Sequence, residues 1–273
     1  AMRPMRSTEM RAGQAGFTLI EAVMVITLTA VIFGVVSMFI APATTAYFAS
    51  SARAQLSDQA DTALRRIARD LARALPNSAR VSGTGLSVEL IPVTSAARYA
   101  VESGDPLQFG ASDTGFDIVG PGLRLATASQ KLAWYNLGAG VADADAYQGT
   151  NVRTATTGAG VATHVNFSGG GLAVPLNASP YRVYAIEQPV SYRCDLSAGT
   201  LTRYTGYGFN SSQAEPPSGG SSAILARKVS ACAFSYDPAA VGGRHGLVNL
   251  QLTLTSQGES VALYQAVHVD NLP

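Results

Sequence analysis

The sequence carries little charge of either sign. Only 14% of its 273 residues are Asp, Glu, Lys or Arg, and the formal net charge is +1. The electrostatic field of such a protein is too weak to attract nucleic acid. The basic residues between 53 and 73 alternate with acidic ones, which is typical of a solvated helix face. We therefore expect no nucleic-acid partner.

Motifs for catalysis are also missing. His164, His245 and His268 are isolated in the sequence, and none has a Cys, Ser or Asp at a spacing typical of a nucleophile motif. The glycine runs at 169–171 and 242–243 lack the lysine and the helix that a phosphate-binding loop needs. We predict that the protein is not an enzyme, has no catalytic residues and uses no cofactor.

Candidate metal ligands are sparse. Two cysteines, Cys194 and Cys232, without clustered histidines make a poor zinc site. Asp143 and Asp145, which precede Gly149, are similar to part of a calcium loop, but the distal bidentate glutamate is missing. We expect no metal, and calcium at these two aspartates stays an open alternative.

The N-terminus lacks the apolar stretch of an ordinary signal peptide. Residues 1–16 contain three arginines and one glutamate, and the apolar run comes after them, in residues 17–41. A helix over residues 17–40 would span about 36 Å, enough for a bilayer core of about 30 Å. The basic residues on its N-terminal side predict that residues 1–16 lie in the cytoplasm and that the rest crosses the membrane.

One carboxylate lies inside this apolar run. Glu21 is near its start, and the next charged residue is Arg53. A charged side chain at the centre of a membrane helix costs roughly 2.5–3.5 kcal/mol on insertion scales, so such a group normally has a partner and a function.

Residues 16 to 21 read Gly-Phe-Thr-Leu-Ile-Glu. This start, with the apolar run behind it, resembles the N-terminus of type IV prepilins, the precursors of pilus subunits and of type II secretion pseudopilus subunits. The resemblance implies that prepilin peptidase cuts between Gly16 and Phe17, removes residues 1–16 and methylates the new N-terminal Phe17. Ala22 stands where a leucine is common in the family, which affects none of these roles.

The resemblance also implies a role for Glu21, which would pair with the N-terminal amine of a neighbouring subunit during assembly. A buried cation and a buried anion each cost several kcal/mol alone, and pairing recovers much of that cost. The pair would therefore set the register of each incoming subunit.

Blocks of sequence farther along the chain resemble the MshO family of minor pilins in the MSHA pilus biogenesis system. This resemblance implies a structural subunit at or near the pilus tip, with other major and minor pilins, prepilin peptidase and the inner-membrane assembly platform as partners. It implies a single-pass inner-membrane protein with a periplasmic C-terminal domain, which later joins a fibre at the cell surface. The blocks are residues 67–81, 88–93, 97–99, 190–194, 203–204, 229–232, 236–238 and 265–273.

Two alternative functions stay open. A minor pseudopilin of the J type in type II secretion shares the anchor and the style of the helix. A tip subunit with adhesive function is the other, because Tyr204, Tyr207 and Phe209 beside an expected exposed loop could stack on a sugar or on another subunit.

A second helical segment is predicted between residues 42 and 76. Pro42 is expected to kink or interrupt the helix, and Pro76 to end it. The face opposite the apolar one carries interleaved charges, including the pairs Asp61–Arg65 and Arg66–Asp70, and is predicted to be solvated. The apolar face recurs at steps of three or four, at Leu56, Ala60, Leu64, Ile67, Leu71 and Leu75.

Residues 77–273 are predicted to form one β-rich domain. Alternation of apolar and polar residues predicts an antiparallel hairpin near the C-terminus, with Val248, Leu250, Leu252 and Leu254 on the buried face of its first strand. Long loops are expected at 138–160 and 210–222. The other strands are expected at 86–93, 131–137, 164–167, 181–194, 201–207 and 232–236.

Together these segments predict an α+β fold, in which a long N-terminal transmembrane and amphipathic helix packs on an antiparallel sheet, as in pilins. The anchor orientation places Cys194 and Cys232 outside the cytoplasm, which favours a disulfide over two free buried thiols.

Overall fold

A computed structural model describes residues 16–241 and 244–273 of the chain. The chain divides into two compact units at the Ser51–Ala52 bond. One helix, α1 (Leu19–Leu71), begins in the first unit and ends in the second, which also holds every strand described below. The predicted combination of a long apolar N-terminal helix with an antiparallel β domain is confirmed.

Helix α1 is not interrupted at Pro42, in contrast to one of the two outcomes expected there. Proline has no N–H to donate to the preceding turn. Threonine hydroxyls bind the carbonyls around it: Thr44 donates to Ile40 at 3.1 Å and Thr45 donates to Pro42 at 2.9 Å. These bonds satisfy the threonine hydroxyls within the helix, on carbonyls next to the proline.

The helix ends at Leu71, five residues before Pro76, so the predicted endpoint is wrong. The last turn tightens, and the Leu75 N–H then donates to the carbonyl of Ile91 at 2.7 Å instead of continuing the helix. Leu75, which precedes a proline, also disfavours helical backbone angles. A hydrogen bond to the β domain therefore ends the helix before Pro76.

The apolar face of the second half of α1 is buried as predicted. Leu56, Ala60, Leu64, Ile67 and Leu71 are each at most 3% exposed. They share one core with side chains from two β-sheets.

The first of these sheets has the order β1-β2-β11-β12-β13 and is antiparallel throughout. β11 and β12 form an antiparallel hairpin. The strands are β1 (Arg80–Val81), β2 (Ser87–Leu90), β11 (Val190–Asp195), β12 (Thr200–Thr205) and β13 (Ser221–Arg227).

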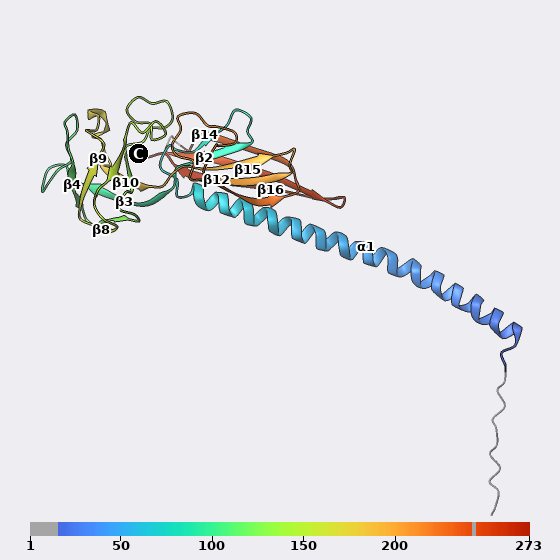
Figure 1. Cartoon of the computed structure of the whole chain (residues 1–273). Helices are drawn as coiled ribbons and strands as arrows, with labels where there is room; N and C mark the ends of the chain where they lie inside the picture. The colour runs from blue at the N-terminus through green and yellow to red at the C-terminus, as the bar shows by residue number, and fades with distance from the viewer. Residues whose placement is uncertain (1–15, 242–243) are drawn as a thin grey trace, which may run out of the picture. The chain divides into compact units, whose positions relative to one another are not determined.

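The second sheet is the C-terminal antiparallel meander β14 (Val229–Val241), β15 (His245–Ser256) and β16 (Glu259–Asp270). Val248, Leu250, Leu252 and Leu254 are fully buried, so the predicted alternation is confirmed. Figure 1 shows both sheets beside the C-terminal part of α1.

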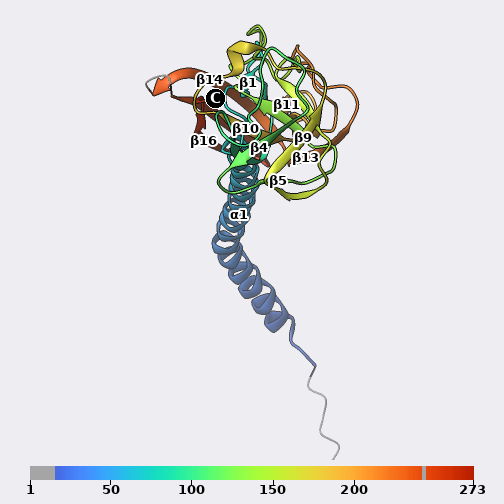
Figure 2. The same ribbon diagram turned by 90° about the vertical axis from the view of Figure 1, so that its left-hand side faces the viewer.

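A third element, a closed antiparallel barrel, was not predicted. Its strands follow the order β10-β3-β4-β9-β7-β6, and a short ribbon of β5 and β8 lies next to it. Figure 2 turns this end of the domain towards the viewer. The strands are β3 (Val93–Tyr99), β4 (Gly115–Val119), β5 (Leu123–Leu125), β6 (Lys131–Trp134), β7 (Val152–Ala155), β8 (Gly160–Ala162), β9 (His164–Ser168) and β10 (Arg182–Ile186), with a 3-10 turn η1 (Val174–Leu176).

The barrel has its own core, separate from the one that covers the helix. Trp134, Phe116 and Phe167 pack together there with ring centroids 5.6–5.9 Å apart. The expected single sheet on the helix is therefore only part of the β domain.

Two predicted segments have different boundaries in the structure. The long loop expected at 138–160 contains β7, and residues 181–194 split into β10 of the barrel and β11 of the first sheet. Pro189 lies in the break, where the chain leaves one sheet for the other.

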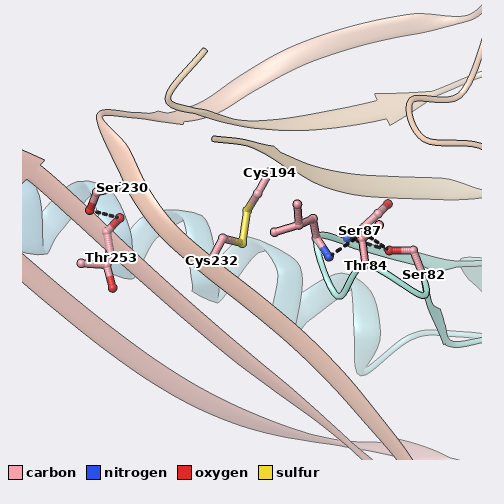
Figure 3. The surroundings of a disulfide bond; sticks show 8 residues. Ser82, Thr84, Ser87, Cys194, Ser230, Cys232 and Thr253 are labelled. Carbon is pink, nitrogen blue, oxygen red and sulfur yellow. Dashed lines mark hydrogen bonds between the residues drawn. A yellow bond between two sulfur atoms is a disulfide. The ribbon is translucent and has the colours of Figure 1, made fainter. Parts of the chain in front are cut away.

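The two sheets that flank the helix are joined by a disulfide. Cys194 of β11 and Cys232 of β14 are bonded, with their Cα atoms 6.4 Å apart and 38 positions separating them in sequence. Figure 3 shows the bond crossing from one strand to the other. Cys194 is fully buried in the core that contains the helix face.

The double substitution Cys194→Ser and Cys232→Ser should lower the free energy of unfolding by about 4 kcal/mol, because a cross-link of this span restricts the unfolded chain. Urea unfolding of the full chain in detergent, followed by circular dichroism, measures the change. A reductant should destabilise the wild type by a similar amount and leave the double variant unaffected. Equal stability of the oxidised wild type and the double variant would contradict the estimate.

Candidate functional site

The start of α1 brings together the residues that the sequence singled out. Gly16, Phe17 and Thr18 precede the helix, which begins at Leu19. The Thr18 carbonyl accepts the N–H of Glu21 at 3.1 Å, and its hydroxyl oxygen lies 3.4 Å from the same nitrogen. Thr18 is therefore the N-cap and Glu21 is the third helical residue.

This arrangement matches a capping box, in which Ser or Thr at the N-cap is followed three residues later by Glu. The Thr-x-x-Glu pattern is visible in the sequence but did not enter the predictions. It explains locally why the helix begins at Leu19, and a carboxylate in the first turn also suits the positive end of the helix dipole.

The residues of the predicted cleavage junction are accessible. Gly16 and Phe17 lie outside regular structure, and Phe17 is 78% exposed. The Glu21 side chain is exposed too, and no cation among residues 16–241 and 244–273 forms an ion pair with it. The carboxylate is thus open to a partner on another molecule.

The helix that follows is long and apolar enough to cross a membrane, and none of its apolar stretch is buried. The Thr27 hydroxyl donates to the carbonyl of Val23 at 2.9 Å, so its polar atom is satisfied within the helix. Exposed apolar surface on this scale is covered in nature by lipid or by other helices. The large exposed apolar side chains are Phe17, Leu19, Ile20, Val23, Met24, Val25, Ile26, Leu28, Val31, Ile32, Phe33, Val35, Val36, Met38, Phe39 and Ile40.

The second half of the helix is fastened to the first sheet by a carboxylate. Asp70 accepts a hydrogen bond from the Tyr192 hydroxyl at 2.5 Å and one from Arg203 at 3.2 Å. Burial and the Asp70 carboxylate raise the pKa of Tyr192 to about 12. The expectation that Asp70 lies on a solvated face is therefore wrong, because its side chain is only 15% exposed and faces the sheet.

The three aromatic residues considered for ligand stacking are not exposed. Tyr204, Tyr207 and Phe209 are each half-buried, and the Tyr207 hydroxyl donates to Glu89 at 2.6 Å. Burial, and then the Glu89 carboxylate, raise the pKa of Tyr207. Glu89 is also paired with Arg80 at 2.6 Å, so Tyr207 belongs to a buried polar network inside the domain.

The aspartates considered for calcium have other roles. The buried Asp145 carboxylate accepts the N–H groups of Gly140 at 2.7 Å and Tyr147 at 2.8 Å, which organises its own loop. Asp143 is exposed. Across the described part of the chain, no three His, Cys, Asp or Glu side chains are grouped to hold a metal ion.

The histidines also occupy ordinary surface positions. His245 and His268 are exposed on β15 and β16. His164 lies 2.8 Å from Asp117, because antiparallel pairing of β4 and β9 sets these two residues opposite each other. This pair was not predicted, since its members are 47 positions apart.

Residues 11–37 match the family model of the prokaryotic N-terminal methylation motif. The matched segment includes the Gly16–Phe17 junction, Glu21 and most of the apolar stretch. The motif indicates a type IV pilin-like or pseudopilin-like protein that is processed by prepilin peptidase, anchored in a membrane and assembled with other pilins.

No curated protein and no solved structure matched the chain. The resemblance of the later blocks to the MshO family therefore has no support from these comparisons.

The hydrogen bond that the His164 ring donates to the Asp117 carboxylate raises the pKa of His164 above its ordinary value of 6.5. The pair then stabilises the fold fully below about pH 6.5 and loses this effect as the pH rises through the raised pKa. Titration of the histidine ring by NMR should show the shift, and Asp117→Asn should return the pKa towards 6.5. The control Asp143→Asn, far from this ring in sequence and exposed, should leave it unchanged. A pKa that Asp117→Asn does not alter would sink the assignment to this pair.

Proposed function

We propose that this protein is a minor pilin, a structural subunit that helps to initiate or assemble a type IV pilus of the MSHA type. Prepilin peptidase cuts between Gly16 and Phe17, removes residues 1–16 and methylates Phe17. The observation that carries the proposal is the match of residues 11–37 to the N-terminal methylation motif. It is supported by the position of these residues at the start of an exposed apolar helix.

The mechanism is assembly rather than catalysis. Residues 17–41 hold the subunit in the inner membrane with its β domain in the periplasm, until the assembly platform passes it into the fibre. The cut frees the amine of Phe17, and Glu21 pairs with such an amine on a neighbouring subunit. The pairing is favourable because each charge alone would be expensive in an apolar bundle of helices.

A minor pseudopilin of the J type in a type II secretion system is the second candidate. The same motif and helix support it, because both kinds of fibre use the same processing. An adhesive tip subunit has less support, because the aromatic side chains that suggested it are half-buried and the Tyr207 hydroxyl is bound to Glu89.

A strain that lacks this protein separates the two candidates. Sheared surface pili and secreted exoproteins are quantified side by side, with the wild-type chain supplied in trans as the control. Loss of pili with normal secretion is the expected result. Loss of secretion with normal pili would assign the protein to the pseudopilus instead.

Glu21→Gln and Glu21→Ala should leave cleavage intact and reduce incorporation into sheared fibres severalfold, because both remove the charge that meets the Phe17 amine. Immunoblots of membrane and fibre fractions measure both quantities. Thr18→Ala is the matched control: it weakens the helix cap by about 0.5–2 kcal/mol but keeps the carboxylate, so incorporation should persist. Normal incorporation of the Gln variant would refute the pairing role of Glu21.

A further inference from the structure

A groove runs along the C-terminal end of α1, from β12 and β13 of the first sheet to residues 92–94 and Glu187. Two adjoining hollows of about 450 and 630 Å³ form it, and they share Arg66 and Arg203. We call this feature the basic groove and define it by Arg66, Arg69, Arg73, Arg203, Ala223 and Leu225.

The groove has an excess of positive charge. Its four arginines face two carboxylates, Asp70 and Glu187. Asp70 is already engaged by Arg66 and Arg203, at 3.5 and 3.2 Å. In a chain with so few charges, this local excess marks the groove as a site for anionic groups.

Two of the arginines form no ion pair within the described part of the domain. Arg69 and Arg73 are exposed, and neither has an ion-pair partner among the described residues. Arg66 and Arg69 lie three residues apart on one side of the helix, and Arg73 lies in the turn that follows Leu71. The donors of Arg69 and Arg73 are free for a ligand.

One wall of the groove is an unpaired strand. β13 ends its sheet and pairs only with β12, which leaves the backbone groups of its outer edge unpaired within the described chain. Residues 221–226 read Ser-Ser-Ala-Ile-Leu-Ala and contain neither a charge nor a proline, the usual protection of a free edge, and the one charge of the strand is Arg227 at its end. Ile224 is 46% exposed on this strand. Such an edge is a template for another strand.

The edge strand β16 of the second sheet lacks the same charge. The hollow beside it is lined by Asp61 and Arg65, which neutralise each other at 2.7 Å. Free backbone groups and uncompensated positive charge therefore coincide at β13.

We propose that the basic groove binds an extended acidic segment of a neighbouring subunit, which adds a strand to β13. Main-chain hydrogen bonds to β13 provide affinity, and carboxylates on alternate residues of the segment reach Arg69 and Arg73. This inference rests on the proposed assembly function and adds to it a surface by which the β domain selects its neighbour.

The probe is the peptide acetyl-Thr-Glu-Val-Glu-Val-Glu-Thr-amide, titrated into the full chain in detergent micelles and followed by fluorescence anisotropy. The wild type should bind it, and the double reversal Arg69→Glu with Arg73→Glu should weaken binding about tenfold, or about 1.4 kcal/mol. A peptide with lysine in place of glutamate should show the opposite preference. A peptide N-methylated at alternate residues should not bind, because it cannot pair with a strand.

The matched control is Arg98→Glu with Arg124→Glu, which reverses one exposed arginine on the barrel strand β3 and one on the adjacent β5, and should leave binding unchanged. Circular dichroism checks that both double variants are folded. Failure of the acidic peptide to bind, equal binding to both double variants, or equal binding of the N-methylated peptide would each overturn the proposal.

Fibre fractions separate this inference from the proposed function. If wild-type chain enters sheared pili but the Arg69→Glu, Arg73→Glu variant does not, while its membrane insertion and cleavage are normal, the groove is supported. If both enter equally, the groove is overturned and the assembly function stands. If wild-type chain enters no fibre while the peptide still binds its groove, the assembly function fails instead. A photo-crosslinker at Ile224 that captures no other subunit in sheared fibres would also overturn the choice of partner.

Discussion

Burial of one face of the second half of α1 is the interaction on which the β domain depends. Ile67 and its apolar neighbours on the helix fill a core that both flanking sheets share. Each fully buried side chain of this kind contributes roughly 1.5–3 kcal/mol. The Asp70–Tyr192–Arg203 cluster and the Cys194–Cys232 bond then hold the sheets at that core.

The two halves of helix α1 differ in which of their faces are apolar, and each half suits a different environment. Its first half is apolar on all sides, which suits lipid or a bundle of helices, and its second half is apolar on one face only, which suits a soluble domain. Glu21 is the exception in the first half. An assembly role gives this carboxylate a partner that the isolated chain does not supply.

The surface available for recognition belongs to the second half of the helix and the first sheet. The acids and bases of the helix are not one uniform solvated face. Asp70 turns inward, and the Asp61–Arg65 pair is neutral. Arg69 lies beside Ala223 and Leu225 of β13, Arg73 lies in the adjoining hollow, and neither has an ion-pair partner among the described residues. Ion pairs within the domain therefore determine which charged side chains can interact with a neighbouring subunit.

The sequence by itself determined the features that depend on local pattern. The motif around Gly16 and Glu21, the apolar run, the buried helix face and the alternation in β15 are all read from neighbouring residues, because helix and strand periods are short. Only the tertiary structure decided the barrel, the free edge of β13 and the inward turn of Asp70. These depend on which strands pair across long stretches of chain, and pairing such as that of Asp117 with His164 leaves no mark at short spacing. The end of the helix also depends on long-range packing. The N–H of Leu75 donates to the carbonyl of Ile91, so the helix ends before Pro76.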